Sequence, residues 1–253
     1  MKMIHFVGAG PGAPDLITLR GARLLEEAGM IIYAGSLVNP ELLKRAKEGC
    51  QIYDSASMTL DEVIEKLCEA HKAGIDAVRL HTGDPSIYGA IREQMDRLRA
   101  LGIPFDLTPG VSSFCAAAAA AEVEYTLPSV SQTVIITRME GRTPVPDKEK
   151  IRLLASHQAS MVLFLSTGLL EGLCAELIAG GYTPDTKAVM VYKASWPEQK
   201  IIRTNLDELP RLAAEAGIKN TALILVGDFL GDEYELSKLY DKHFSHAFRK
   251  ASE

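Results

Sequence analysis

The fold class follows from the stretch Met3-Ile4-His5-Phe6-Val7, which leads directly into the loop Gly8-Ala9-Gly10-Pro11-Gly12. An apolar run of this length predicts a buried strand, which the glycine and proline residues bring to an end. The pattern recurs where Ala77-Val78-Arg79-Leu80-His81 leads into Thr82-Gly83-Asp84-Pro85. Open α/β sheets bind ligands at the carboxyl ends of their strands, and glycine allows a close approach of the backbone. The two loops therefore predict an α/β protein that holds one ligand between them, and so a cofactor enzyme.

The composition is that of a globular protein. The 253 residues are 47% hydrophobic and 24% charged, which is enough apolar mass for a core in each half. The formal net charge is -6 and the isoelectric point is about 5.6. This acidic balance argues against a surface that follows nucleic-acid phosphates, although it permits a local basic pocket. Nucleic acid is therefore not an expected partner.

Cysteine spacing and hydropathy indicate the compartment. The cysteines are far apart in the sequence, at Cys50, Cys68, Cys115 and Cys174. This spacing fits neither a zinc site nor a disulfide framework. No signal peptide is apparent, and no apolar run approaches the ~18 residues of a membrane span. We expect a cytoplasmic protein with reduced thiols and no membrane partner.

Strand and helix signals alternate along the first half, which predicts a mostly parallel sheet with helices on both faces. Thr18 is expected to cap the first helix, and Thr59 with Glu62 to form a capping box at a later one. The predicted strands are 3–7, 30–33, 76–81 and 104–108, and the predicted helices are 18–28, 59–73, 87–101 and 111–121.

A break near 127–132 precedes a second set of elements. The strand at 199–204 is expected to pair with 187–193 across the turn Ser195-Trp196-Pro197-Glu198. The other predicted strands are 133–138, 160–166 and 222–226, and the predicted helices are 148–157, 169–179 and 206–216. The predicted domains are an N-terminal α/β domain at 1–127, a C-terminal α/β domain at 132–235 and a polar tail at 236–253. The residues after Gly231 are expected to be helical at the surface.

The glycine loop matches the dinucleotide-binding fingerprint G-x-G-x-x-G only in part. Pro11 lacks a backbone N–H, and Gly12 comes one residue before the third glycine of that motif. Ala34 follows the second strand, where the motif has an acidic residue. NAD binding is therefore disfavoured, and a tight strand-to-helix turn without a ligand stays an alternative.

Two further loops offer hydroxyl groups and a carboxylate. Thr82-Gly83-Asp84-Pro85 provides one of each beside an approachable backbone, and Gly110-Val111-Ser112-Ser113 adds two hydroxyls at a helix start. Such groups accept hydrogen bonds from an amino group or a ribose, whereas a carboxylate repels phosphate. Ordinary turns and helix caps remain the alternative for each loop by itself. Together the loops favour S-adenosylmethionine over a dinucleotide, whose pyrophosphate is anionic.

Five segments, in this order, resemble the tetrapyrrole (corrin/porphyrin) methylase family: Gly8–Gly12, Asp15–Gly21, Gly83-Asp84-Pro85, Pro109–Ser113 and Thr221–Gly227. The resemblance implies two α/β domains with the cofactor cleft between them, a homodimer, and S-adenosyl-L-methionine as the methyl donor. The residues that it implies at the cofactor are Pro11, Thr82, Gly83, Asp84, Ile87, Ser112, Ser113, Ser166, Ala194, Ala222 and Leu223.

The assignment to one branch of the family rests on one short segment. Tyr33-Ala34-Gly35-Ser36-Leu37-Val38 resembles the branch that methylates carbon 11 of precorrin-4 or cobalt-precorrin-4 in cobalamin biosynthesis. Uroporphyrinogen methylases carry an aspartate after the tyrosine, where this chain has Ala34. The alternatives are a methylase for another precorrin carbon, a methylase of ribosomal RNA, a non-methylating nucleotide-binding protein and an NAD-linked oxidoreductase.

Methyl transfer asks little of side chains once the two reactants are held in line, so no general base is named. A precorrin carries many carboxylates, and cations near strand ends are candidates to pair with them; the alternative for each is ordinary surface charge. These cations are Arg79, Arg138, Arg142, Lys193 and Lys200. His243 and His246 have helical spacing but no third ligand, so no protein-bound metal is expected and any cobalt arrives in the substrate.

Overall fold

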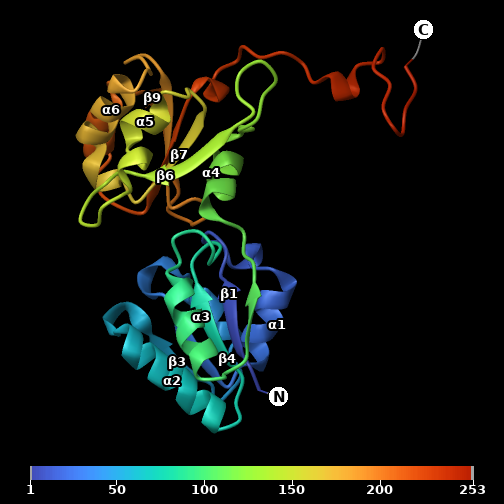
Figure 1. The fold of residues 1–253 in the computed structure, drawn as a ribbon, viewed down its shortest axis with the longest axis vertical. Helices are drawn as coiled ribbons and strands as arrows, with labels where there is room; N and C mark the ends of the chain where they lie inside the picture. The colour runs from blue at the N-terminus through green and yellow to red at the C-terminus, as the bar shows by residue number, and fades with distance from the viewer. Residues whose placement is uncertain (1, 252–253) are drawn as a thin grey trace. The chain divides into compact units, whose positions relative to one another are not determined.

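The computed structural model describes residues 2–251, with Ser36 described by its backbone alone, and the chain divides into two compact units (Figure 1). The first unit comprises the residues up to Ala116 together with Lys193–Gln199. The second comprises Ala117–Tyr192 and the residues from Lys200 onward. Both units combine a five-stranded sheet with helices, so the predicted α/β class is confirmed. The domain limits at 127 and 132 stay predictions.

The sheet of the first unit is entirely parallel, as the alternating pattern predicts. Its strand order is β3-β2-β4-β1-β5. The strands are β1 (Ile4–Gly8), β2 (Met30–Tyr33), β3 (Gln51–Asp54), β4 (Ala77–His81) and β5 (Phe105–Thr108). Because β1 lies between β4 and β5, the loops that follow these three strands are neighbours at one edge of the sheet.

Helices cover both faces of this sheet, because alternate residues of a strand point to opposite faces. Phe6 of β1 belongs to a core cluster with Leu67 of α2 (Leu60–Lys72) and Leu98 of α3 (Ile91–Ala100). Val7 belongs to another cluster, with Leu25 of α1 (Leu19–Glu27). Side-chain oxygens of Thr18 and Thr59 accept backbone N–H groups at the starts of α1 and α2, so both predicted caps are confirmed.

The sheet of the second unit is mixed. β6 (Val134–Arg138) and β7 (Ser160–Phe164) are parallel, and every other pair is antiparallel. The order is β6-β7-β10-β8-β9, with β10 (Ala222–Val226) buried at the centre. The remaining elements are β8 (Lys187–Tyr192), β9 (Lys200–Asn205), α5 (Ile151–Ala155), α6 (Leu170–Ala179) and α7 (Leu209–Glu215). Tyr192 of β8 pairs with Lys200 of β9, so the predicted antiparallel pairing of the strands at 187–193 and 199–204 is confirmed.

The structure differs from the prediction in three places. α3 begins at Ile91 rather than 87, because Tyr88 and Ala90 adopt left-handed backbone angles that end any preceding helical turn. β3 has no predicted counterpart, since its edge position leaves no apolar run. Between Gly231 and Ala251 the described residues form a 3-10 turn at Lys238–Tyr240 and a β-bridge between His246 and Arg249 but no α-helix, so the prediction of a helical tail is wrong. α4 (Ser113–Ala121) follows the third loop, near its predicted position.

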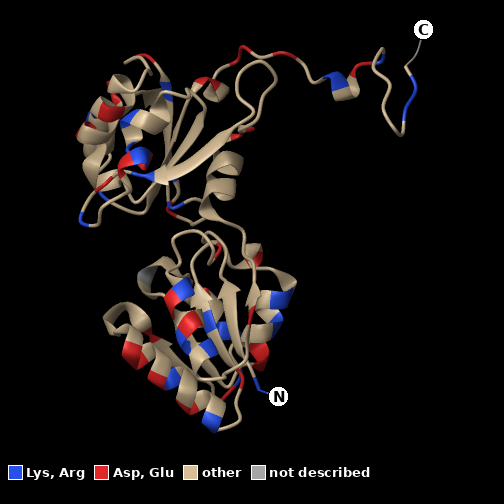
Figure 2. Ribbon diagram, in the orientation of Figure 1, with Lys and Arg blue, Asp and Glu red and all other residues tan. Residues whose placement is uncertain are grey.

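The helix surfaces of the first unit carry charges of both signs, as Figure 2 shows for α2 and α3. Arg97 of α3 pairs with Asp61 of α2 at 2.7 Å, and Arg92 pairs with Asp96 within α3 at 2.8 Å. These mixed charges give the two helices no single-sign face. Among residues 2–251 no helix is both long enough and apolar enough to cross a bilayer.

Candidate functional site

The loops that follow β1 and β4 are joined through their backbones. The Gly10 N–H donates to the Gly83 carbonyl at 3.2 Å, and the Gly83 N–H donates to the Gly10 carbonyl at 2.8 Å. Both glycines have positive φ angles, of 80° and 59°, which other residues adopt only with strain. The first two predicted loops are therefore brought together.

Glycine is also required where the third loop meets the other two. A Cβ atom on Gly110 would lie 2.1 Å from the Gly83 carbonyl oxygen and 2.8 Å from the Gly8 Cα. A Cβ atom on Gly8 would lie 2.6 Å from Gly110. No side chain fits there, so the three backbones pack directly on one another.

Asp84 ties the second loop to the third. Its Oδ2 accepts the N–H of Gly110 at 2.9 Å, and its Oδ1 accepts the N–H of Ser86 at 2.8 Å and the Ser86 hydroxyl. Burial by itself would raise the pKa of the Asp84 carboxyl, but these three donors outweigh it and hold that pKa below its ordinary value. The group is thus an ionised carboxylate whose remaining lone pairs can accept further hydrogen bonds.

Eight of the predicted site residues belong to the first unit: Pro11, Thr82, Gly83, Asp84, Ile87, Ser112, Ser113 and Ala194. Ser112 and Ser113 lie beside Gly83, since a Cβ atom on Gly83 would be 3.6 Å from the Ser112 Cα and 3.4 Å from the Ser113 nitrogen. The N–H of Ile87 donates to the Asp84 carbonyl at 3.2 Å. No lysine or arginine is among these residues, so the loops present neutral and anionic groups.

Two side chains that were not among the predicted site residues also hold the first loop. The Asn39 amide donates from Nδ2 to the Gly12 carbonyl at 2.8 Å, in a buried position. The Trp196 indole donates from Nε1 to the Pro11 carbonyl at 3.0 Å. A tryptophan in a proline-containing turn between two strands was the available signal, because so large a side chain seldom stays unpacked.

The five cationic side chains considered as partners for substrate carboxylates lie in different environments. From the sequence Arg79 is a candidate partner for substrate or an ordinary surface charge, and in the structure it is neither, because its guanidinium is buried within β4 and donates to Gln94 Oε1 and the Ile32 carbonyl, both at 3.1 Å. Arg138 donates to the carbonyls of Thr143 and Pro144. The Lys193 ammonium lies over the Trp196 ring, whereas Arg142 and Lys200 are exposed.

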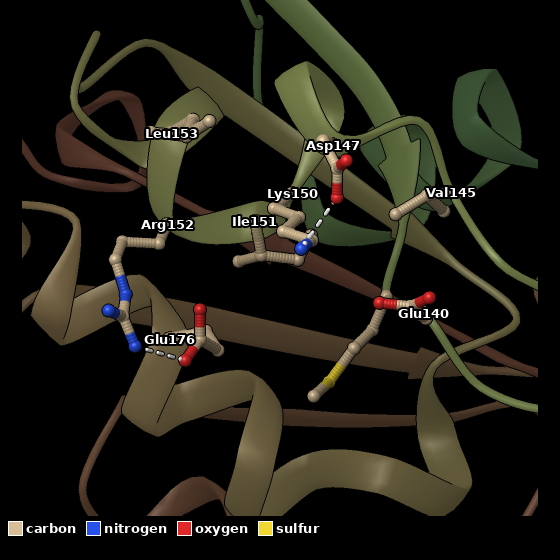
Figure 3. Close-up of a pocket in the computed structure, with 9 residues that line it drawn as sticks. Glu140, Val145, Asp147, Lys150, Ile151, Arg152, Leu153 and Glu176 are labelled. Carbon is tan, nitrogen blue, oxygen red and sulfur yellow. Dashed lines mark hydrogen bonds and ion pairs between the residues drawn. The ribbon is translucent and has the colours of Figure 1, made fainter.

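A cavity of about 650 Å³ lies in the second unit, beside α5 (Figure 3). Its two ion pairs join Lys150 to Asp147 and Arg152 to Glu176, each at 2.7 Å. None of the predicted site residues lines this cavity. Within residues 2–251, no group of three or more histidine, cysteine or acidic side chains could hold a metal ion.

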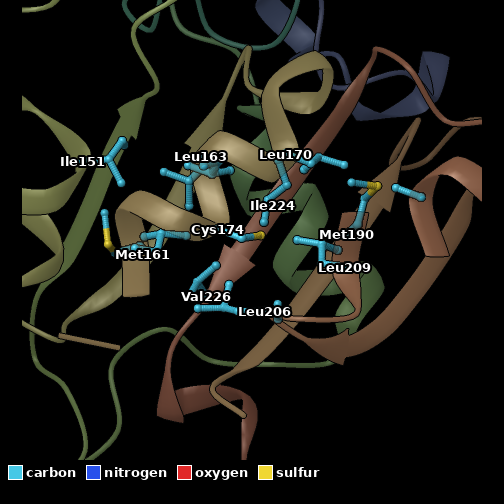
Figure 4. Close-up of a cluster of buried hydrophobic side chains, with 14 of the residues drawn as sticks. Ile151, Met161, Leu163, Leu170, Cys174, Met190, Leu206, Leu209, Ile224 and Val226 are labelled. Atoms are coloured by element: carbon cyan, nitrogen blue, oxygen red, sulfur yellow. The ribbon is translucent and has the colours of Figure 1, made fainter. Parts of the chain in front are cut away.

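The other three predicted residues, Ser166, Ala222 and Leu223, belong to the second unit. The buried Ser166 hydroxyl accepts the Met139 N–H at 2.9 Å and donates to the Phe164 carbonyl at 2.7 Å. The Thr167 hydroxyl, which no sequence signal marked, donates to the Ala222 carbonyl at 3.1 Å. Ala222 belongs to the core cluster of this unit, which Figure 4 shows around Ile224.

Comparison with known proteins gives one family. Residues 3–210 match the model of the Tetrapyrrole (Corrin/Porphyrin) Methylases. The chain is 53% identical over 251 residues to the cobalt-precorrin-4 C(11)-methyltransferase of Methanocaldococcus jannaschii, covering 99% of this chain and 97% of that one.

Two solved structures have the same fold. The X-ray structure of a cobalt precorrin-4 methyltransferase, a cobalamin biosynthetic enzyme, gives a TM-score of 0.89 at 45% identity, covering 91% of this chain and 96% of that one. A uroporphyrin-III C-methyl transferase from Thermus thermophilus, complexed with S-adenosylhomocysteine, gives 0.75 at 26% identity, covering 90% of this chain and 93% of that one.

Proposed function

Because this chain belongs to the tetrapyrrole (corrin/porphyrin) methylases, we propose that it methylates carbon 11 of precorrin-4 or cobalt-precorrin-4 in cobalamin biosynthesis. The family that the five ordered segments resemble is confirmed, and the chain is a methyltransferase. The observation that carries the choice of carbon is the 53% identity, over nearly the whole chain, to a cobalt-precorrin-4 C(11)-methyltransferase. We further propose that the enzyme acts in the cytoplasm as a homodimer.

The methyl donor is S-adenosyl-L-methionine, which supplies an activated methyl group on a sulfonium. The three loops fit such a molecule, because they offer a carboxylate, hydroxyls and backbone groups to its amino, ribose and sulfonium groups and place no cation among them. A solved relative holds S-adenosylhomocysteine, the demethylated form of this donor. The predicted residues Pro11, Thr82–Asp84, Ile87, Ser112, Ser113, Ser166, Ala194, Ala222 and Leu223 are proposed to bind it.

The protein contributes to catalysis by holding the methyl donor and the substrate and by orienting them toward each other. Packed glycine backbones fix the three loops, so their donors and acceptors are placed before the reactants arrive. Holding two reactants in near-attack geometry supplies roughly 7–11 kcal/mol of the barrier. No side chain is assigned as a general base.

Labelled methyl transfer tests the function directly. We expect the protein to transfer one methyl group from labelled S-adenosylmethionine to cobalt-precorrin-4 or precorrin-4, and NMR to place it on carbon 11. It should bind S-adenosylhomocysteine in calorimetry and leave NADH unbound. A new methyl on another carbon would establish the alternative methylase, whereas NADH binding alone would exclude methylation altogether.

Asp84→Asn tests the role of the carboxylate. An amide cannot present acceptors to both Ser86 and Gly110 with the strength of an ionised group, so we expect about tenfold weaker binding of S-adenosylhomocysteine. Calorimetry measures this change, and circular dichroism verifies the fold. The control is Asp61→Asn, which removes an exposed carboxylate paired with Arg97 and should leave binding unchanged. Equal affinity in the Asp84 variant and the wild type would remove Asp84 from the site.

A further inference from the structure

The connection between β8 and β9, Lys193–Gln199, contains the only tryptophan of the chain, Trp196. These residues belong to the first unit, apart in sequence from the rest of it. Two of their side chains contact the residues Pro11–Ala13, which directly follow the Gly8–Gly10 turn. The segment therefore acts on the loop that the cofactor is proposed to meet.

Three contacts fasten the segment to that loop. The Trp196 Nε1–H donates to the Pro11 carbonyl at 3.0 Å, and the Ser195 hydroxyl oxygen accepts the Ala13 N–H at 3.0 Å. The indole also packs directly against Gly12, where a Cβ atom would be 2.1 Å from Cδ1. Three consecutive residues of the loop are thus held by two consecutive residues of the segment.

The segment takes a shape that its own residues disfavour. Lys193 and Ser195 have φ angles of 47° and 68°, and neither is glycine. Such backbone strain persists only where surrounding contacts over-determine it. Within the segment, the Trp196 N–H donates to the Lys193 carbonyl at 3.0 Å, and the Lys193 ammonium lies 5.2 Å from the centre of the indole ring. These contacts within the segment, together with those to the loop, hold the indole in place.

A side chain from another segment, Asn39, also holds the loop. The buried Asn39 side chain donates to the Gly12 carbonyl at 2.8 Å, so the peptide groups of Pro11 and Gly12 each give their carbonyl to a side-chain donor. These carbonyls would otherwise be free to turn. Because both carbonyls are hydrogen-bonded, the orientation of the Pro11 and Gly12 peptide groups is set, and with it the backbone surface that a ligand can contact.

We propose that Trp196 is a positioning residue for the methyl donor, acting through the Pro11 carbonyl and Gly12 without touching the donor itself. The proposal rests on the proposed function, in which Pro11 and Ala194 bind S-adenosylmethionine. Ala194 lies two residues before Trp196, so the same contact sets the separation of both binding residues. A donor that meets both residues binds well only when the indole holds the loop in place.

Trp196→Phe keeps an aromatic ring and removes the N–H donor. We expect the dissociation constant of S-adenosylhomocysteine and the KM for S-adenosylmethionine to rise about tenfold, with kcat unchanged, because the same binding energy is lost in the ground state and in the transition state. A purely structural role would lower the unfolding temperature and leave KM as it was. Tyr240→Phe, which removes a hydroxyl from an exposed tail residue, is the control and should change none of these values.

Fluorescence gives a second measurement on the wild type, since all tryptophan emission comes from Trp196. Titration with S-adenosylhomocysteine should change this emission with the dissociation constant found by calorimetry. Ser195→Ala keeps the tryptophan and frees the Ala13 N–H, and we expect several-fold weaker binding with an altered emission before ligand is added.

The outcomes separate the two proposals. If Trp196→Phe and Ser195→Ala bind as the wild type does, or if the ligand binds without changing the emission, the positioning role is overturned while the methylase function stands. If the wild-type protein binds no S-adenosylhomocysteine, both proposals fall. A tenfold rise in KM with constant kcat supports the role of Trp196.

Discussion

Gly110→Ala is expected to weaken S-adenosylhomocysteine binding about 100-fold and to lower the free energy of unfolding by about 3 kcal/mol. The new methyl group would lie 2.1 Å from the Gly83 carbonyl oxygen and 2.8 Å from the Gly8 Cα. Both neighbours are backbone, so relief requires the loop after β5 to move away from the loops after β1 and β4. That movement breaks the hydrogen bond from the Gly110 N–H to Asp84 Oδ2, which ties the second loop to the third.

Calorimetry with S-adenosylhomocysteine and urea unfolding measure the two effects. The matched control is Gly74→Ala in the same unit, where the φ angle is 67° but nothing lies within 4 Å of the added atom. Left-handed strain should cost that variant about 1 kcal/mol of stability and leave binding unchanged. An alanine at 110 that binds the ligand with wild-type affinity would show that close packing of the three backbones is not needed.

Acidification from pH 7 to pH 5 is expected to remove about 2 kcal/mol of stability through His81 alone. Burial, reinforced by the nearby Arg79 guanidinium, lowers the pKa of His81 from 6.5 to about 3. Between these values the unfolded chain binds a proton that the folded chain does not. The free energy of unfolding therefore falls as the pH drops below 6.5, by about 1.4 kcal/mol per pH unit.

Urea unfolding of His81→Gln at both pH values isolates this contribution. The variant should lose about 2 kcal/mol less than the wild type between pH 7 and pH 5, since glutamine does not titrate. His157→Gln, at an exposed position, is the control and should keep the wild-type slope. Parallel pH dependence in the wild type and His81→Gln would mean that His81 is protonated in the folded protein.

The parallel sheet and its three loops were predictable because buried strands of such sheets are continuous apolar runs that end in glycine and proline. β1 and β4 have such runs, and both end where predicted to within a residue. The antiparallel hairpin of β8 and β9 was predictable from its intervening proline turn. The cofactor-binding residues were predicted from the family resemblance rather than from any single loop.

Other features depend on contacts between segments that are distant in sequence. β3 pairs along its length with β2 although its residues are mostly exposed, so no apolar pattern announces it. Arg79 looks like a surface cation in sequence, yet Gln94 and the Ile32 carbonyl satisfy it inside the core. The contact of Trp196 with Pro11 joins residues 185 positions apart, and no local pattern encodes such a pair.

The separation in sequence between Pro11 and Trp196 has a consequence for synthesis on the ribosome. All five strands of the parallel sheet emerge before any part of the second unit, but Lys193–Gln199 emerge only after β6, β7 and β8. A nascent chain can therefore complete that sheet while Gly12 still lacks its indole cover. The loop Gly8–Gly12, which we propose contacts the methyl donor, therefore acquires its final shape only after most of the polypeptide has been made.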